Sequence, residues 1–93
     1  MSQADSRDRQ GLLDLISQVQ FGETRVRPGY VKQDVDQFLL EVRATLAGAR
    51  QPPLSPADVR AAQFRTTRLH RGYDEEQVDA FLDRIEQGLR QAG

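Results

Sequence analysis

The sequence contains no cysteine and no tryptophan. Without cysteine there can be no disulfide bond, no thiol catalysis and no thiolate metal site, and the composition agrees with a reducing compartment. Only 6% of the residues are aromatic, so a core must consist mainly of Leu, Val, Ile and Ala with four Phe. This composition favours helices over strands, and 93 residues leave room for one small domain.

The chain also lacks a strong charge of either sign. Its 13 basic and 14 acidic residues are interspersed and leave a net charge of -1, which argues against nucleic-acid binding along the whole surface. Residues 1–10 contain no apolar run typical of a signal peptide, and no segment approaches the roughly 18 apolar residues of a membrane span. We therefore expect a cytoplasmic protein.

An internal repeat organises the sequence. At an offset of 43 residues, ten residues of one segment are identical to their counterparts in the other. Self-similarity of this kind indicates a tandem duplication. The identical residues are Phe21, Thr24, Arg25, Gly29, Tyr30, Val35, Asp36, Phe38, Leu39 and Leu46 in the first copy, and Phe64, Thr67, Arg68, Gly72, Tyr73, Val78, Asp79, Phe81, Leu82 and Leu89 in the second.

The repeat divides the chain into four parts. We expect a disordered tail over residues 1–10, a first repeat over 11–47, a Gly/Pro linker over 48–53 and a second repeat over 54–92. Each repeat is predicted to contain a short helix, an irregular loop and a long amphipathic helix. The predicted fold is all-α, with the two long helices packed together as a pseudo-dimer. Their apolar stripes are Val35, Phe38, Leu39, Val42 and Leu46, and Val78, Phe81, Leu82, Ile85 and Leu89.

Helix-start signals are stronger in the second repeat. Ser55, Pro56 and Asp58 form a capping-box pattern for its short helix, which we expect to end near Phe64. Asp74 is predicted to cap its long helix. In the first repeat Val31 occupies the corresponding position and cannot cap, so its long helix should be the weaker one.

The loops carry the candidate contact residues. Gly29 and Gly72, each followed by Tyr30 or Tyr73, are predicted to occupy turns that need an unusual backbone conformation. The second loop is basic around an apolar tip, and we weigh a partner or membrane contact against simple solvation; its residues are Arg65, Arg68, Leu69, His70 and Arg71. Two ion pairs are also conceivable from the sequence, Asp36 with Arg25 and Asp79 with Arg68. The alternative is that these side chains remain solvated.

Two segments of the second repeat carry a family resemblance. They are Leu54-Ser-Pro-Ala-Asp-Val and the string from Arg71-Gly72-Tyr73-Asp74 through Val78-Asp79-Ala80-Phe81-Leu82. Together they resemble the N-terminal domain of the DivIVA family of bacterial cell-division proteins. The resemblance extends over residues 54–89 and, less closely, over 12–46. It implies a paired helical module that presents a loop to anionic membrane at septa and poles. By this resemblance the loop is residues 66–71, with Arg71, Gly72 and Tyr73 as the shared elements.

These observations favour a non-enzymatic interaction module over an enzyme. No nucleophile and base can be paired among the residues present, and we expect no cofactor, no metal and no nucleic acid. The expected partner is a protein of the division or cell-wall-growth machinery, with weak contact to anionic membrane through Leu69, and recruitment to the septum or pole. We expect the two repeats of one chain to pair as a pseudo-dimer, or else two chains to pair as a homodimer. The alternative function is a small helical DNA-binding or regulatory protein.

Overall fold

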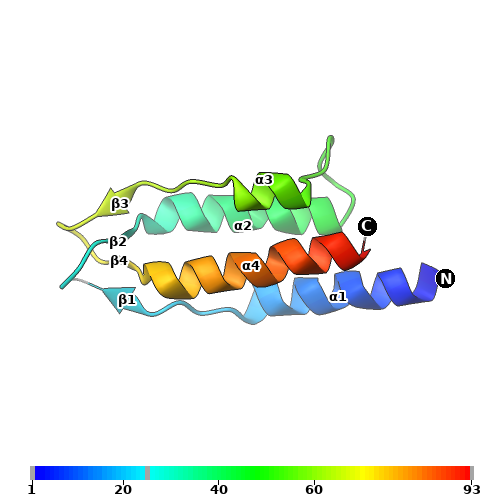
Figure 1. The fold of residues 1–93 in the computed structure, drawn as a ribbon, viewed down its shortest axis with the longest axis horizontal. Coiled ribbons are helices and arrows are strands. Elements are labelled where there is room, and N and C mark those ends of the chain that lie inside the picture. The colour runs from blue at the N-terminus through cyan, green and yellow to red at the C-terminus, as the bar shows by residue number, and fades with distance from the viewer. Residues whose placement is uncertain (1, 25, 93) are drawn as a thin grey trace.

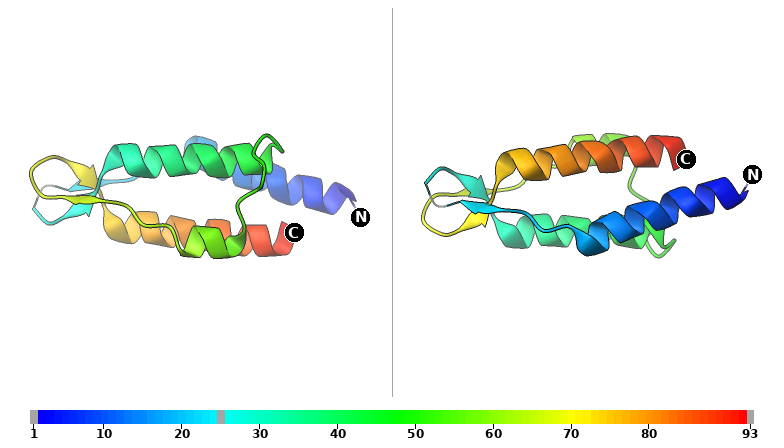
Figure 2. Two further views of the ribbon diagram at one scale, coloured as in Figure 1. Left: turned by 90° about the horizontal axis from the view of Figure 1, so that it is seen from above. Right: turned by 90° about the horizontal axis from the view of Figure 1, so that it is seen from below.

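The computed structural model describes residues 2–24 and 26–92. These residues form four helices and four two-residue strands in an elongated molecule of 48 × 22 × 18 Å (Figure 1). The helices run along the long axis, and the strands gather at one end, where the chain turns back twice (Figure 2). The order is α1 (Ser2–Gln18), β1 (Glu23–Thr24), β2 (Gly29–Tyr30), α2 (Lys32–Leu46), α3 (Pro56–Arg60), β3 (Thr66–Thr67), β4 (Gly72–Tyr73) and α4 (Glu75–Ala92).

The prediction of an all-α fold is wrong. The segments expected to be irregular loops form an antiparallel four-stranded sheet in the order β1-β4-β2-β3. Each strand pairs with strands of the other repeat, as in the register Glu23↔Tyr73 and Tyr30↔Thr66. The chain is therefore mixed α/β and does not consist of two tandem helical modules, because the sheet interleaves the repeats.

Two glycines allow the strands to interleave. A Cβ atom added to Gly29 would lie 2.9 Å from the carbonyl oxygen of Tyr73, and one added to Gly72 would lie 2.8 Å from the carbonyl carbon of Gly29. Real side chains do not tolerate such distances to backbone. The predicted reason, an unusual turn conformation, is incorrect: among the described residues only Gly48, just beyond the end of α2, has a positive φ, of 75°.

The core lies between the helices. The stripes of α2 and α4 contribute eight buried residues, while Phe38 and Leu89 are half-buried against the same cluster. Leu12 and Ile16 of α1 and Val59 of α3 complete it. The buried stripe residues are Val35, Leu39, Val42, Leu46, Val78, Phe81, Leu82 and Ile85.

The first helices of the two repeats differ from expectation. Residues 2–10, expected as a disordered tail, form the N-terminal half of the 17-residue α1, because each residue added to an existing helix gains a backbone hydrogen bond. In contrast, α3 has only five residues and ends at Arg60, before the predicted Phe64. It begins as the sequence indicates: Ser55 and Asp58 form a reciprocal capping box at 3.1 and 2.9 Å, with Pro56 at the first position.

Candidate functional site

The loops that follow β1 and β3 lie together at the sheet end of the molecule (Figures 1 and 2). We call residues 26–28 and 68–71 the loop end. Val26 is 99% exposed and Leu69 is 91% exposed. These two residues are equivalent at the 43-residue offset, so both repeats present an apolar side chain to solvent at the same end. Large apolar side chains this exposed indicate a contact surface when they occur together.

Sequence reasoning identified Leu69 but missed Val26. The signal was present, since the repeat alignment places Val26 opposite Leu69. The two loops differ directly after this position, because Val26 is followed by Arg27 and Pro28, where the second repeat has His70 and Arg71. Only the structure shows that both loops leave the sheet at the same end of the molecule.

Basic residues occur in both loops that carry the apolar tips. Arg27 Nη2 lies 2.7 Å from Asp74 Oδ2, and its side chain remains 60% exposed. Arg71 Nη1 lies 3.6 Å from Glu23 Oε1, and Lys32 also binds Glu23. Salt bridges of this exposed kind contribute little stability, but they direct the two guanidinium groups toward acidic residues at the base of the loops, next to β1 and the start of α4.

The acidic partners are held in their charged forms. The pKa of Asp74 is lowered by a hydrogen bond from the backbone of Gln77 and by the side chain of Arg27. Lys32, with Arg71 adding to its effect, lowers the pKa of Glu23. Asp74 Oδ1 accepts the Gln77 N–H at 3.2 Å at the start of α4, whereas Val31 makes no side-chain cap for α2.

Two of the predicted loop residues have other surroundings. Arg65 makes a two-pronged contact with Asp34 at 2.9 and 2.7 Å, away from the tip, and lowers the pKa of Asp34 to about 2. Arg68 and His70 are exposed in the loop itself, where the His70 backbone N–H donates to Thr67 Oγ1 at 3.3 Å. The loop end therefore carries Arg27, Arg68, His70 and Arg71, but not Arg65.

The aspartates of the two expected aspartate–arginine pairs both accept hydrogen bonds from tyrosine hydroxyl groups. Asp79 accepts a 2.8 Å hydrogen bond from the hydroxyl group of Tyr30, and no described contact joins it to Arg68. Asp36 accepts the equivalent bond, also 2.8 Å, from Tyr73. Arg25 lies outside the described residues. Because each bond joins one repeat to the other, the loops are anchored across the sheet.

Aromatic contacts support the same anchoring. Phe21 packs against Tyr73 with ring centroids 5.2 Å apart, and Phe64 packs against Tyr30 at the same separation. Each pair again joins opposite repeats, and edge or tilted arrangements at this distance are favourable. The base of the loop end is thus held by packing and hydrogen bonds while its tips remain exposed.

Within the described residues, no helix combines the length and apolar character that crossing a membrane requires. A search of family models, of curated proteins and of solved structures gives no match for this chain.

Proposed function

We propose that this protein is a non-enzymatic adaptor that docks through its loop end onto an anionic membrane surface, as a peripheral module of the bacterial division or polar-growth machinery. The observation that carries the proposal is the joint exposure of Val26 and Leu69 at one end, in loops that also contain Arg27, Arg68 and Arg71. The resemblance of residues 71–82 to the DivIVA N-terminal domain supports the cellular setting.

The arrangement suits shallow contact with a bilayer. A rigid base holds two apolar tips outward, so they can enter the interface together without reordering the backbone. Arginine side chains in the same loops can reach lipid phosphate groups, for which the guanidinium group has the right hydrogen-bonding geometry.

The expected affinity is modest. Burying Val26 and Leu69 contributes at most about 1.5 to 3 kcal/mol each, and each basic residue near an anionic surface adds about 1 kcal/mol. The acidic residues Glu23, Asp74, Glu75 and Glu76 near the same end oppose part of the electrostatic attraction. Such sums correspond to dissociation constants from millimolar to tens of micromolar, so stable recruitment requires a protein partner or clustering.

Flotation with liposomes tests this proposal. The parent protein should bind vesicles that contain phosphatidylglycerol and should not bind vesicles of phosphatidylcholine alone. Val26→Asp and Leu69→Asp should each weaken binding, and the double variant should abolish it. Leu40→Asp is the matched control, because Leu40 is an exposed leucine on α2, remote from the loops.

Two results would contradict the proposal. One is vesicle binding that persists in the Val26→Asp/Leu69→Asp double variant. The other is tighter binding to a duplex DNA than to anionic vesicles at the same salt concentration, which would favour the alternative of a DNA-binding protein. In cells, a fluorescent fusion should concentrate at septa or poles, and the double variant should do so less.

A further inference from the structure

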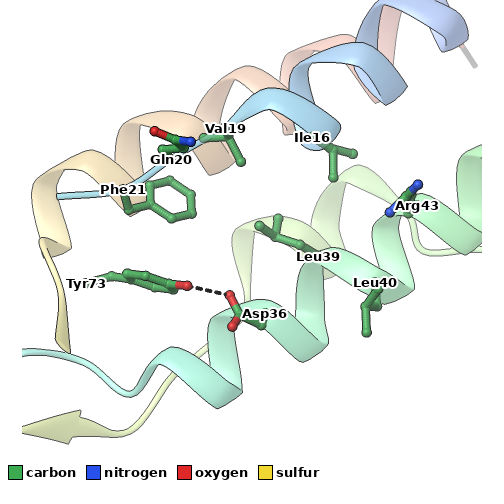
Figure 3. A pocket seen from close by; sticks show the side chains of 9 residues that line it. All are labelled: Ile16, Val19, Gln20, Phe21, Asp36, Leu39, Leu40, Arg43 and Tyr73. Atoms are coloured by element: carbon green, nitrogen blue, oxygen red, sulfur yellow. Dashed lines mark hydrogen bonds between the residues drawn. The ribbon is translucent and has the colours of Figure 1, made fainter. Parts of the chain in front are cut away.

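A second surface lies on the first repeat, away from the loop end. A cavity of about 410 Å³ opens between the C-terminal part of α1 and one face of α2 (Figure 3). Val19, Phe21, Leu39 and Leu40 give it an apolar lining. Tyr73 stands at one end and Arg43 at the other, as Figure 3 shows. We call this cavity the α1–α2 groove; its volume falls within the range of roughly 300 to 1,000 Å³ typical of ligand sites.

The same place on the second repeat has different chemistry. The 43-residue offset converts Leu40 into Asp83 and Arg43 into Glu86, and both acidic residues line a smaller cavity of about 300 Å³ between α3 and α4. Glu86 is already satisfied there: Arg60 and Arg90 both donate hydrogen bonds to its carboxylate. These two arginines lower the pKa of Glu86 to about 2. The acidic residue that replaces Arg43 in the second cavity is therefore already paired.

The groove on the first repeat has no such internal partner. Leu40 is 55% exposed at its edge. Arg43 is exposed and forms no ion pair with any residue in 9–24 or 26–91, the ranges whose side chains are described. Asp36, the acidic residue of the lining, accepts a hydrogen bond from Tyr73 at the opposite end.

We propose that the α1–α2 groove binds an acidic amphipathic segment of a partner protein, with apolar side chains in the cavity and a carboxylate on Arg43. The charge complementarity follows from Arg43, whose guanidinium group can hold a carboxylate in two-pronged geometry. The apolar requirement follows from Leu39, Leu40 and Val19. Insertion of an amphipathic helix into an apolar groove is a common mode of peptide recognition. Only the first repeat offers this site, because the second repeat carries the acidic Asp83 in place of Leu40, and Glu86, already paired with Arg60 and Arg90, in place of Arg43.

A defined peptide can test the charge selection. The probe is a fluorescein-labelled, 16-residue peptide of Ala and Gln with Leu at positions 5 and 9 and Glu at position 12, three positions that share one helical face. Two companion peptides carry Gln or Lys at position 12. Fluorescence anisotropy gives affinities, and amide chemical shifts in nitrogen-15 NMR spectra locate the binding site.

The Glu peptide should bind more tightly than the Gln peptide, and the Gln peptide more tightly than the Lys peptide. Arg43→Glu should weaken binding of the Glu peptide by about tenfold, the typical effect of losing one charge-assisted hydrogen-bonded pair, and should favour the Lys peptide instead. Leu40→Asp should weaken all three. Both substitutions copy residues that the second repeat carries at equivalent positions, so the fold should tolerate them; circular dichroism verifies this.

Arg84→Glu is the matched control, since it makes the same charge change on an exposed part of α4 that lines neither cavity. It should leave all affinities unchanged, as should Leu69→Asp at the loop end. The proposal is overturned if none of the peptides binds below millimolar concentration, if Arg43→Glu changes the affinities no more than Arg84→Glu, or if the shifted amides lie outside α1 and α2. None of these results depends on whether the loop end binds membranes.

Discussion

The hydroxyl group of Tyr73 donates a 2.8 Å hydrogen bond to Asp36, which belongs to the other repeat. Tyr30 makes the reciprocal 2.8 Å bond to Asp79. The two bonds tie the sheet to the second turns of α2 and α4, where Asp36 and Asp79 lie. They link residues 37 and 49 positions apart, and so couple the two halves of the chain.

Removing either hydroxyl group should destabilise the fold. Tyr73→Phe leaves the ring packing in place and deletes the bond to Asp36, for which we expect a loss of about 1 to 2 kcal/mol in the free energy of unfolding, because the acceptor is charged. Urea denaturation followed by circular dichroism measures this loss. In a double-mutant cycle with Asp36→Asn, the two losses should not be additive; full additivity would show that the bond contributes nothing.

The tyrosine contacts also predict an unusual alkaline titration. Partial burial, reinforced by the neighbouring Asp79, raises the pKa of Tyr30 from 10.0 to about 12. Partial burial and Asp36 raise the pKa of Tyr73 to about 12 as well. These are the only two tyrosines, and there is no tryptophan, so ultraviolet absorbance at high pH reports on them alone.

The pKa values of Tyr30 and Tyr73 are both raised in the folded state, so the two hydroxyl groups stabilise the fold fully below about pH 10. This stabilisation is lost as the pH rises through about 12. The native protein at pH 10 should show little tyrosinate, whereas the protein in urea should be about half ionised. Asp36→Asn should lower the pKa of Tyr73. If the native and unfolded titration curves coincide, the hydrogen bonds from the two tyrosines to Asp36 and Asp79 do not form.

Acid should weaken the fold through two carboxylates. Arg65 lowers the pKa of Asp34 from 3.8 to about 2, and Arg60 with Arg90 lowers that of Glu86 from 4.5 to about 2. A carboxyl group whose pKa is lower in the folded state stabilises the fold at pH values above its pKa in the unfolded state. This stabilisation is lost as the pH falls through the pKa of the folded state. The melting temperature should therefore fall between about pH 4.5 and pH 2.

Asp34→Asn should lower the melting temperature at pH 7 and reduce its dependence on pH over this acidic interval. Asp83→Asn is the control, because Asp83 is exposed and makes no hydrogen bond or ion pair in the described part of the chain. If both variants respond to acid as the parent does, the Arg65–Asp34 contact is not a source of the pH dependence.

The close approach of the two central strands predicts a strict need for glycine. Gly72→Ala places a methyl group 2.8 Å from backbone atoms of Gly29 and Tyr30, so the sheet must separate. We expect a loss of more than about 2 kcal/mol, in the range of overpacked cores. Gly11→Ala in α1 is the control: nothing lies within 4 Å of the added methyl group, and alanine should raise helix stability by up to about 1 kcal/mol. Thermal melting distinguishes these opposite signs.

Capping asymmetry predicts a stabilising substitution. Val31 precedes α2 without a side-chain cap, whereas Asp74 caps α4 at the equivalent position. Val31→Asp should exceed Val31→Ala in stability by about 0.5 to 2 kcal/mol, the usual contribution of a cap. The alanine variant accounts for the loss of the half-buried valine side chain. Equal stability of the two variants would show that the start of α2 does not need a cap.

The sequence alone determined the duplication, the positions of α2 and α4, and the residues that these helices bury. These features depend on local periodicity and on capping chemistry, which a linear pattern displays directly. The stripe from Val78 to Ile85 repeats at helical spacing, and Ser55 with Asp58 marks the start of α3. The apolar tip at Leu69 was also predicted from the sequence, since Leu69 lies between Arg68 and His70 in a basic loop.

Only the tertiary structure decided the sheet, the reason for the glycines and the grouping of the contact residues. Strands of two residues are too short to show the alternation by which strands are predicted, and each pairs with a segment more than 30 residues away in the chain. The Gly29–Gly72 contact and the Tyr73–Asp36 bond exist only once the repeats interleave. The loops of Val26 and Leu69 share one end of the molecule for the same reason, because the arrangement of distant segments is a property of the packed chain and not of local sequence.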